Sequence, residues 1–232
     1  MDERQIARLD HGLLIGWVAV SLLGRRFLPL LPARVEDQHE LAAAVASQAP
    51  GALTWGPLLL FAAGLPLALS AIRRDLRGRD RGWSNLAFAF GVAGFLLLVV
   101  GLSLNLVEMT LAGAYIDSWE ATARQALLSR FQAAFRADEW ISGVSIVLLA
   151  AWMGLLSRIS MRPMPALLPT WFGWAGVIGA LVTAVAGLWG SLSVGAMRAV
   201  DGGDALLLVH LWIGLVCALM WDRSQVARPT ST

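Results

Sequence analysis

Six polar or ionisable residues lie inside or at the ends of long apolar stretches of the chain. They are Arg25, Arg26, Asn105, Glu108, Glu139 and His210. Such side chains are costly to bury in a bilayer, so they are candidates for a functional role. Arginine beside carboxylates would neutralise both charges, and histidine beside a carboxylate could carry a proton at physiological pH. These residue types indicate a site for a polar ligand, a lipid headgroup or a proton, or a set of ion pairs that joins helix ends.

The spacing of these residues predicts that they share one depth. In a helix that starts at Gly12, Arg25 lies about 20 Å along the axis, and His210 lies about 9 Å along a helix that starts at Asp204. Asn105, Glu108 and Glu139 occur where two further apolar stretches end or begin. We therefore expect one polar layer near the outer membrane boundary. The alternative for Arg25 and Arg26 is that their side chains extend to lipid phosphates.

Catalytic motifs do not occur in the sequence. There is no GxSxG nucleophile elbow, no P-loop and no HExxH. General acid–base chemistry would need Glu108 or Glu139 to act with His210. The sequence therefore favours a protein that is not an enzyme, and the alternative is a membrane enzyme that acts on a lipid or a quinone.

Cofactor chemistry is limited by composition. All 18 basic residues are arginine. Without lysine, the chain cannot form a retinal Schiff base or use lysine in covalent catalysis. His39 and His210 are the one histidine pair that could share a haem, and Cys217 is the sole cysteine. We predict no cofactor and no metal site.

Long apolar stretches dominate the chain, which is 57% hydrophobic with a mean hydropathy of +0.66. A membrane-spanning helix needs about 20 mostly apolar residues. The sequence therefore predicts an all-α, polytopic membrane protein that forms one integral membrane domain over residues 1–232. Its six expected spans cover residues 12–31, 53–72, 84–107, 140–156, 171–193 and 205–221.

Arginine placement predicts the orientation of these spans. Arg73, Arg74, Arg77, Arg79 and Arg81 all lie in the short connection after the second span. Positively charged loops stay in the cytoplasm. With six spans, both termini are then cytoplasmic, and 11 of the 18 arginines lie on that side. Because the pI near 9.4 reflects these loop arginines, we do not expect nucleic acid as a partner. Frequent Ala, Arg and Gly suit a GC-rich genome, and we expect a protein of the bacterial inner membrane.

Two long extracytoplasmic loops are expected to contain surface helices. Residues 32–50 are rich in Ala, Leu, Glu and Gln, which favour helix. In residues 108–139, an apolar stripe recurs every four residues at Ala123, Leu127, Phe131 and Phe135. This pattern predicts an amphipathic helix on the outer leaflet or over the bundle, with Ser118 as its N-cap.

Small residues recur every four positions in and just after the fifth span. They are Ala175, Gly179, Thr183, Gly187, Ser191 and Gly195. A row of small residues lets a second helix approach closely. The pattern indicates packing against another span of the same chain, or a face for a homodimer or partner subunit.

Three functions follow as hypotheses. The first is a non-catalytic, accessory or stabilising subunit of a membrane complex, whose partners are the lipid bilayer and other membrane subunits or a second copy. The second is a transporter, or a protein that binds a small ligand or lipid in the outer polar layer. The third is the membrane enzyme described above.

Overall fold

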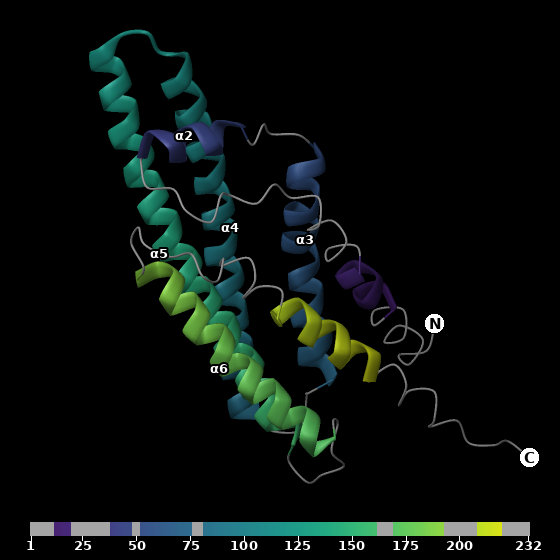
Figure 1. Cartoon of the computed structure of the whole chain (residues 1–232). Helices are drawn as coiled ribbons and strands as arrows, with labels where there is room; N and C mark the ends of the chain where they lie inside the picture. Colours follow the sequence, from purple (N-terminus) through teal and green to yellow (C-terminus); the bar gives the residue numbers. More distant parts are fainter. Residues whose placement is uncertain are drawn as a thin grey trace, which may run out of the picture.

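The protein is described by a computed structural model, which covers residues 12–19, 38–47, 52–75, 81–161, 169–192 and 208–219. All regular secondary structure in these ranges is helical, which confirms the all-α prediction for the described part of the chain. Two short helices cover residues 12–19 and Leu208–Leu219. The labelled helices (Figure 1) are α2 (Gln38–Ser47), α3 (Ala52–Asp75), α4 (Arg81–Asp117), α5 (Ala121–Ser160) and α6 (Thr170–Leu192).

Three of these helices are long and apolar enough to cross a membrane. They are α4, α5 and the Thr170–Leu188 part of α6. The expected spans 84–107 and 140–156 fall within α4 and α5, and the expected span 171–193 overlaps α6 but extends past its last described residue, Leu192. Helix α3 coincides with the expected span 53–72 and has 24 residues, whereas Leu208–Leu219 is short and most of 12–31 lies outside the described residues. The described residues therefore support a membrane protein but do not confirm six spans.

Helices α4 and α5 form one long antiparallel hairpin (Figure 1). They contain 37 and 40 residues, which correspond to about 55 and 60 Å of helix. The helix predicted over Ala123–Phe135 is confirmed as part of α5, but the prediction of a loop over residues 108–139 is wrong, because α4 continues to Asp117 and α5 begins at Ala121. Between Ala121 and Glu139 no glycine or proline interrupts the helix. Ser118 is not the N-cap; Glu120 occupies that position without a side-chain capping bond.

The α4–α5 interface follows alternating three- and four-residue steps on both helices. On α4, residues 84, 87, 91, 94, 98, 101, 108, 112 and 115 are buried. On α5, the matching series 128, 131, 135, 138, 142, 145, 149, 152, 156 and 159 is buried or half-buried. This seven-residue repeat is the pattern of coiled-coil packing. We call these two series the seam of the hairpin.

Among the residues that the structure describes, two apolar cores lie along the seam. The larger core surrounds Leu149 and Trp152 of α5 and includes residues of α3, α4, α6 and both short helices. The smaller core surrounds Phe131 of α5 and joins α4 to α2 through Ala42 and Val45. We call the parts of α2, α4 and α5 around this smaller core the head. The prediction that residues 32–50 contain a helix is confirmed by α2.

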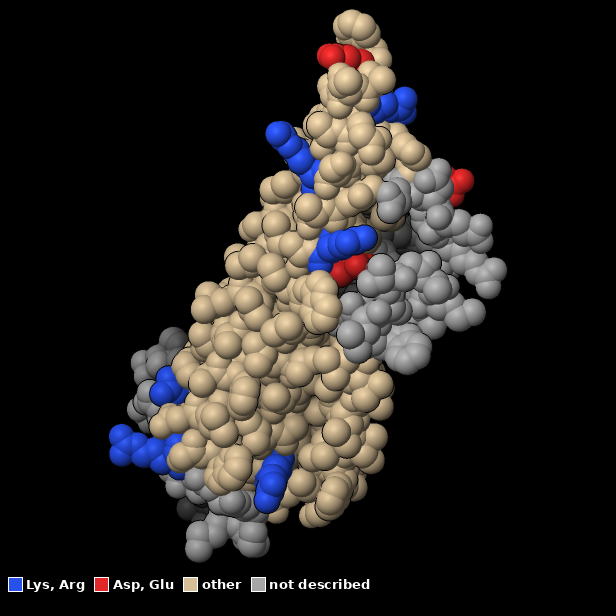
Figure 2. All heavy atoms as spheres, turned by 90° about the vertical axis from the view of Figure 1, so that its left-hand side faces the viewer, with Lys and Arg blue, Asp and Glu red and all other residues tan. Residues whose placement is uncertain are grey.

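Figure 2 shows charged side chains along the upper half of the molecule and again near its lower end, with an uncharged surface between them. At one end the Arg73 guanidinium lies 4.1 Å from the Phe88 ring centre, and Arg158 lies 5.8 Å from that of Trp83. On α5 no charged residue occurs between Glu139 and Arg158. That interval of 18 residues spans about 27 Å, close to the thickness of a hydrocarbon core of about 30 Å.

Candidate functional site

The seam contains polar side chains at positions that coiled coils usually fill with apolar residues. Ser145 of α5 donates a hydrogen bond of 2.8 Å to the carbonyl oxygen of Gly94. One turn before Ser145 on α5, Ser142 donates a hydrogen bond to Asp138 Oδ1 at 3.0 Å. Both of these side chains lie against Gly101, where an added Cβ would be 2.9 Å from Ser142 Oγ. Glycine at position 101 therefore makes room for a carboxylate and a hydroxyl between the helices.

Glu108 is the most deeply buried carboxylate among the described residues. It is 2% exposed and lies two turns beyond Gly101 on the buried face of α4. The antiparallel register set by Gly94 with Ser145 and Leu149 places Glu108 opposite Phe131 and Phe135. A buried carboxylate costs free energy unless it is paired or hydrogen-bonded, so Glu108 is a candidate for ligand or proton binding.

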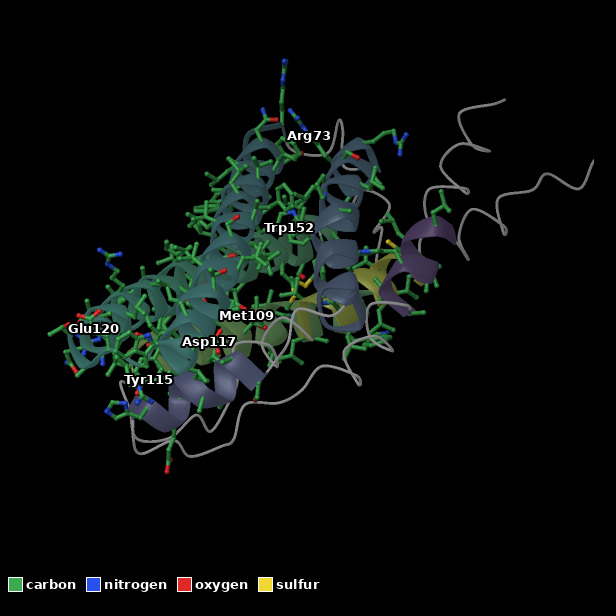
Figure 3. All side chains as sticks on the ribbon, turned by 90° about the horizontal axis from the view of Figure 1, so that it is seen from above. Arg73, Met109, Tyr115, Asp117, Glu120 and Trp152 are labelled. Carbon is green, nitrogen blue, oxygen red and sulfur yellow. The ribbon has the colours of Figure 1, made fainter. Side chains whose placement is uncertain are left out.

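Tyr115 closes the seam near the end of α4. The only tyrosine of the chain, it is 3% exposed and forms a hydrogen bond with His39 Nδ1 of α2. The Arg124 guanidinium lies 4.7 Å from the centre of its ring. Figure 3 shows Tyr115 and Glu120 at one end of the hairpin, with Arg73 at the other. Tyr115 thus connects α2 to both helices of the hairpin.

His210 lies in the larger core. Its ring stacks on Trp17 with 5.8 Å between ring centres, and Trp17 packs directly on Gly64 of α3. Two turns of helix separate His210 from Cys217, which is fully buried. Glu108, by contrast, lies one turn before Ala112, a residue of the smaller core. The predicted single layer is therefore divided between the two cores.

The other predicted site residues occupy different positions. Asn105 and Glu139 are half-buried on α4 and α5, so Asn105 and Glu108 share the last part of α4. Arg25 and Arg26 lie outside the described residues. Within the described ranges, no group of three or more His, Cys, Asp or Glu side chains could hold a metal ion.

The small-residue face of α6 packs on α5. An added Cβ at Gly187 would lie 2.7 Å from Ile146 Cγ2, and one at Gly179 would lie 2.9 Å from Met153 Cε. Thr183 is fully buried between them, but Ala175 is exposed. A strict four-residue spacing drifts about 40° per step around a helix, which moves Ala175 off the contact. The Ser191 side chain and Gly195 lie outside the described residues.

Sequence reasoning missed three members of the seam and head. Asp138, Ser142 and Tyr115 were not among the predicted site residues. The signal that identifies them is the seven-residue repeat, which includes Asp138, Ser142 and Ser145 on α5 and Gly94, Gly101, Glu108 and Tyr115 on α4. A search for four-residue spacing passes over this repeat.

Comparisons with known proteins give no relative from which a function could be transferred. No family model, no curated protein and no solved structure matches the chain. The functional argument therefore depends on the geometry of the seam, the head and the larger core.

Proposed function

We propose that the chain is a non-catalytic subunit of a membrane complex, in which the head contacts other proteins outside the bilayer. The proposed orientation is a multi-pass protein of the bacterial inner membrane, with six spans and both termini in the cytoplasm. The arginine-rich connection between α3 and α4 supports this orientation. The head then lies on the extracytoplasmic side.

The length of the head and its separate core support this proposal. The uncharged interval of α5 begins after Glu139. On the other side of Glu139, α5 contains 18 further residues, from Ala121 to Asp138, which span about 27 Å. This part has a core of its own, in which Phe131 is fully buried and α2 covers the seam. A simple connection between spans needs only a few residues. A helical head with its own core supports a role in contacts above the membrane surface.

Native mass spectrometry tests this proposal. The full chain would be extracted with a mild detergent from its own host and measured without crosslinking. Other protein chains at fixed stoichiometry would support the proposed subunit role. A chain that is found only alone, or only as a homodimer, would contradict it.

Buried polar residues in the seam favour a second candidate function, a transporter or a protein that binds a small ligand or lipid. Glu108 is almost completely buried, and Asp138 lies beside Ser142 and Gly101 at the same end of the uncharged interval. In the same mass spectra, a reproducible non-protein mass would support this function. If this mass disappears in both Glu108→Gln and Asp138→Asn, the ligand binds in the seam. If both variants keep the mass, the seam is not the binding site.

A further inference from the structure

The tip of the hairpin exposes a large aromatic side chain. Trp119 is 94% exposed, more than any other large apolar residue that the structure describes. It lies in the three-residue connection between α4 and α5, at the far end of the head from the uncharged interval. In the orientation proposed above, a distance of about 27 Å separates this tip from the bilayer. The indole therefore cannot be buried in the membrane that holds the chain.

The connection that carries Trp119 is short and is hydrogen-bonded to the start of α5 on the side of Glu120. Helix α4 ends at Asp117 and α5 begins at Ala121, and the Arg124 amide donates a bond of 2.9 Å to the Glu120 carbonyl oxygen. Thr122 donates a 2.7 Å hydrogen bond to Glu120 Oε1. Below the tip, Tyr115 is buried against α2 and α5. A three-residue connection between two packed helices has fewer backbone conformations to lose on binding than a long loop has.

The charge around Trp119 identifies the kind of partner. Asp117 and Glu120 are exposed on either side of it, and Ile116 beside them is 47% exposed. Arg124, the nearest basic residue along the chain, has its guanidinium over the Tyr115 ring. An anionic lipid surface would repel these two carboxylates. An apolar protein pocket with Arg or Lys at its rim would match both the indole and the charges.

We propose that residues 116–120 form a docking tip, and that Trp119 inserts into an apolar pocket, bordered by basic side chains, on a partner protein. This inference depends on the proposed subunit role and names the part of the chain that makes the contact. Tryptophan is prominent among the few residues that dominate the binding energy of protein interfaces. The acidic neighbours would then orient the tip and increase the rate of association.

The test compares variants of the full chain, expressed in the native host, by the native mass spectrometry described above. In Trp119→Ala, we expect at least a tenfold loss of partner occupancy. Trp171→Ala is the matched control, because Trp171 is 68% exposed but lies at the start of α6. We expect it to keep the partner. Asp117→Asn with Glu120→Gln should lower occupancy and make the remaining binding less sensitive to salt.

Three results would overturn this inference. Retention of the partner by Trp119→Ala at the wild-type level would refute the docking tip while leaving the subunit role intact. Absence of any partner from the wild type would refute both proposals. Binding of the reconstituted chain to added phosphatidylglycerol vesicles, if lost in Trp119→Ala, would assign the tip to a lipid surface instead.

Discussion

Ser145 of α5 and Gly94 of α4 join the two helices of the hairpin directly, because the serine hydroxyl donates a 2.8 Å hydrogen bond to the glycine carbonyl oxygen. The contact depends on the missing side chain of Gly94. An added Cβ there would lie 2.9 Å from Leu149 Cγ and 3.1 Å from the Ser145 carbonyl oxygen. Because the Ser145 carbonyl oxygen is a backbone atom, it cannot move aside to make room for a side chain at position 94.

Gly94→Ala is therefore expected to destabilise the protein by about 1–3 kcal/mol through overpacking of the seam. Gly113→Ala is the matched control on the same helix, because an added Cβ there meets nothing within 4 Å. Alanine favours helix over glycine, so the control should be neutral or stabilising by up to about 1 kcal/mol. Unfolding of the purified chains in mild detergent measures both changes. Equal effects of the two substitutions would contradict close packing at Gly94.

Ser145→Ala removes the cross-helix hydrogen bond itself. The hydroxyl is fully buried, so we expect a loss of about 0.5–1.5 kcal/mol in the same unfolding measurement. Ser129→Ala is the control, because the Ser129 hydroxyl is exposed and bonds only to the Gln125 carbonyl of its own helix. A Ser145→Ala protein as stable as the wild type would show that this bond contributes nothing to the seam.

Thr183→Val is expected to leave stability unchanged or to raise it by up to about 1 kcal/mol. Thr183 is fully buried in the α5–α6 contact, and its hydroxyl oxygen has no hydrogen-bond partner among the described residues. Valine has nearly the same shape and removes a buried polar group that costs free energy. Thr110→Val is the comparison, because the exposed Thr110 hydroxyl bonds to the Leu106 carbonyl. Marked destabilisation by Thr183→Val would contradict this description of α6.

Tyr115→Phe is expected to loosen α2 from the head while the hairpin remains folded. The substitution removes the bond to His39 and keeps most of the apolar contact with Phe131 and Val45. Amide hydrogen exchange should increase in residues 38–47 and change little in the larger core. His39→Ala should produce the same change. If the two substitutions act additively in the double variant, the bond does not couple α2 to α4.

Much of the fold can be predicted from the lengths of the apolar stretches. Two of the expected spans fall within α4 and α5, and a third overlaps α6, because those stretches are near the length needed to cross a bilayer. The extent of the hairpin could not be predicted from hydropathy. The four-residue apolar stripe from Ala123 to Phe135 predicted a surface helix, but the residues that pack against α4 follow the seven-residue repeat through Leu128, Phe131 and Phe135.

The candidate site was predicted less well than the fold. Glu108 is buried on α4, but it lies opposite Phe131 and Phe135 in the head and not beside the uncharged interval of α5. The spacing within single helices does not determine which helices meet, and His210 stacks on Trp17 in the larger core, whereas Glu108 lies toward the smaller one. The contact of His39 with Tyr115 joins residues 76 positions apart. Such contacts depend on tertiary packing that periodicity does not reveal.

The position of the head relative to the bilayer is the central claim. Single cysteines at Ala126, Ala133 and Val144 would test it, because all three side chains are exposed on α5 and the native Cys217 is fully buried. The probe is a membrane-impermeant maleimide, added to the outer face of intact spheroplasts. We expect rapid labelling at positions 126 and 133 and protection at position 144, with Arg74→Cys labelled only after permeabilisation. Protection at 126 and 133, or equal labelling at 144, would contradict a head that projects from the extracytoplasmic surface.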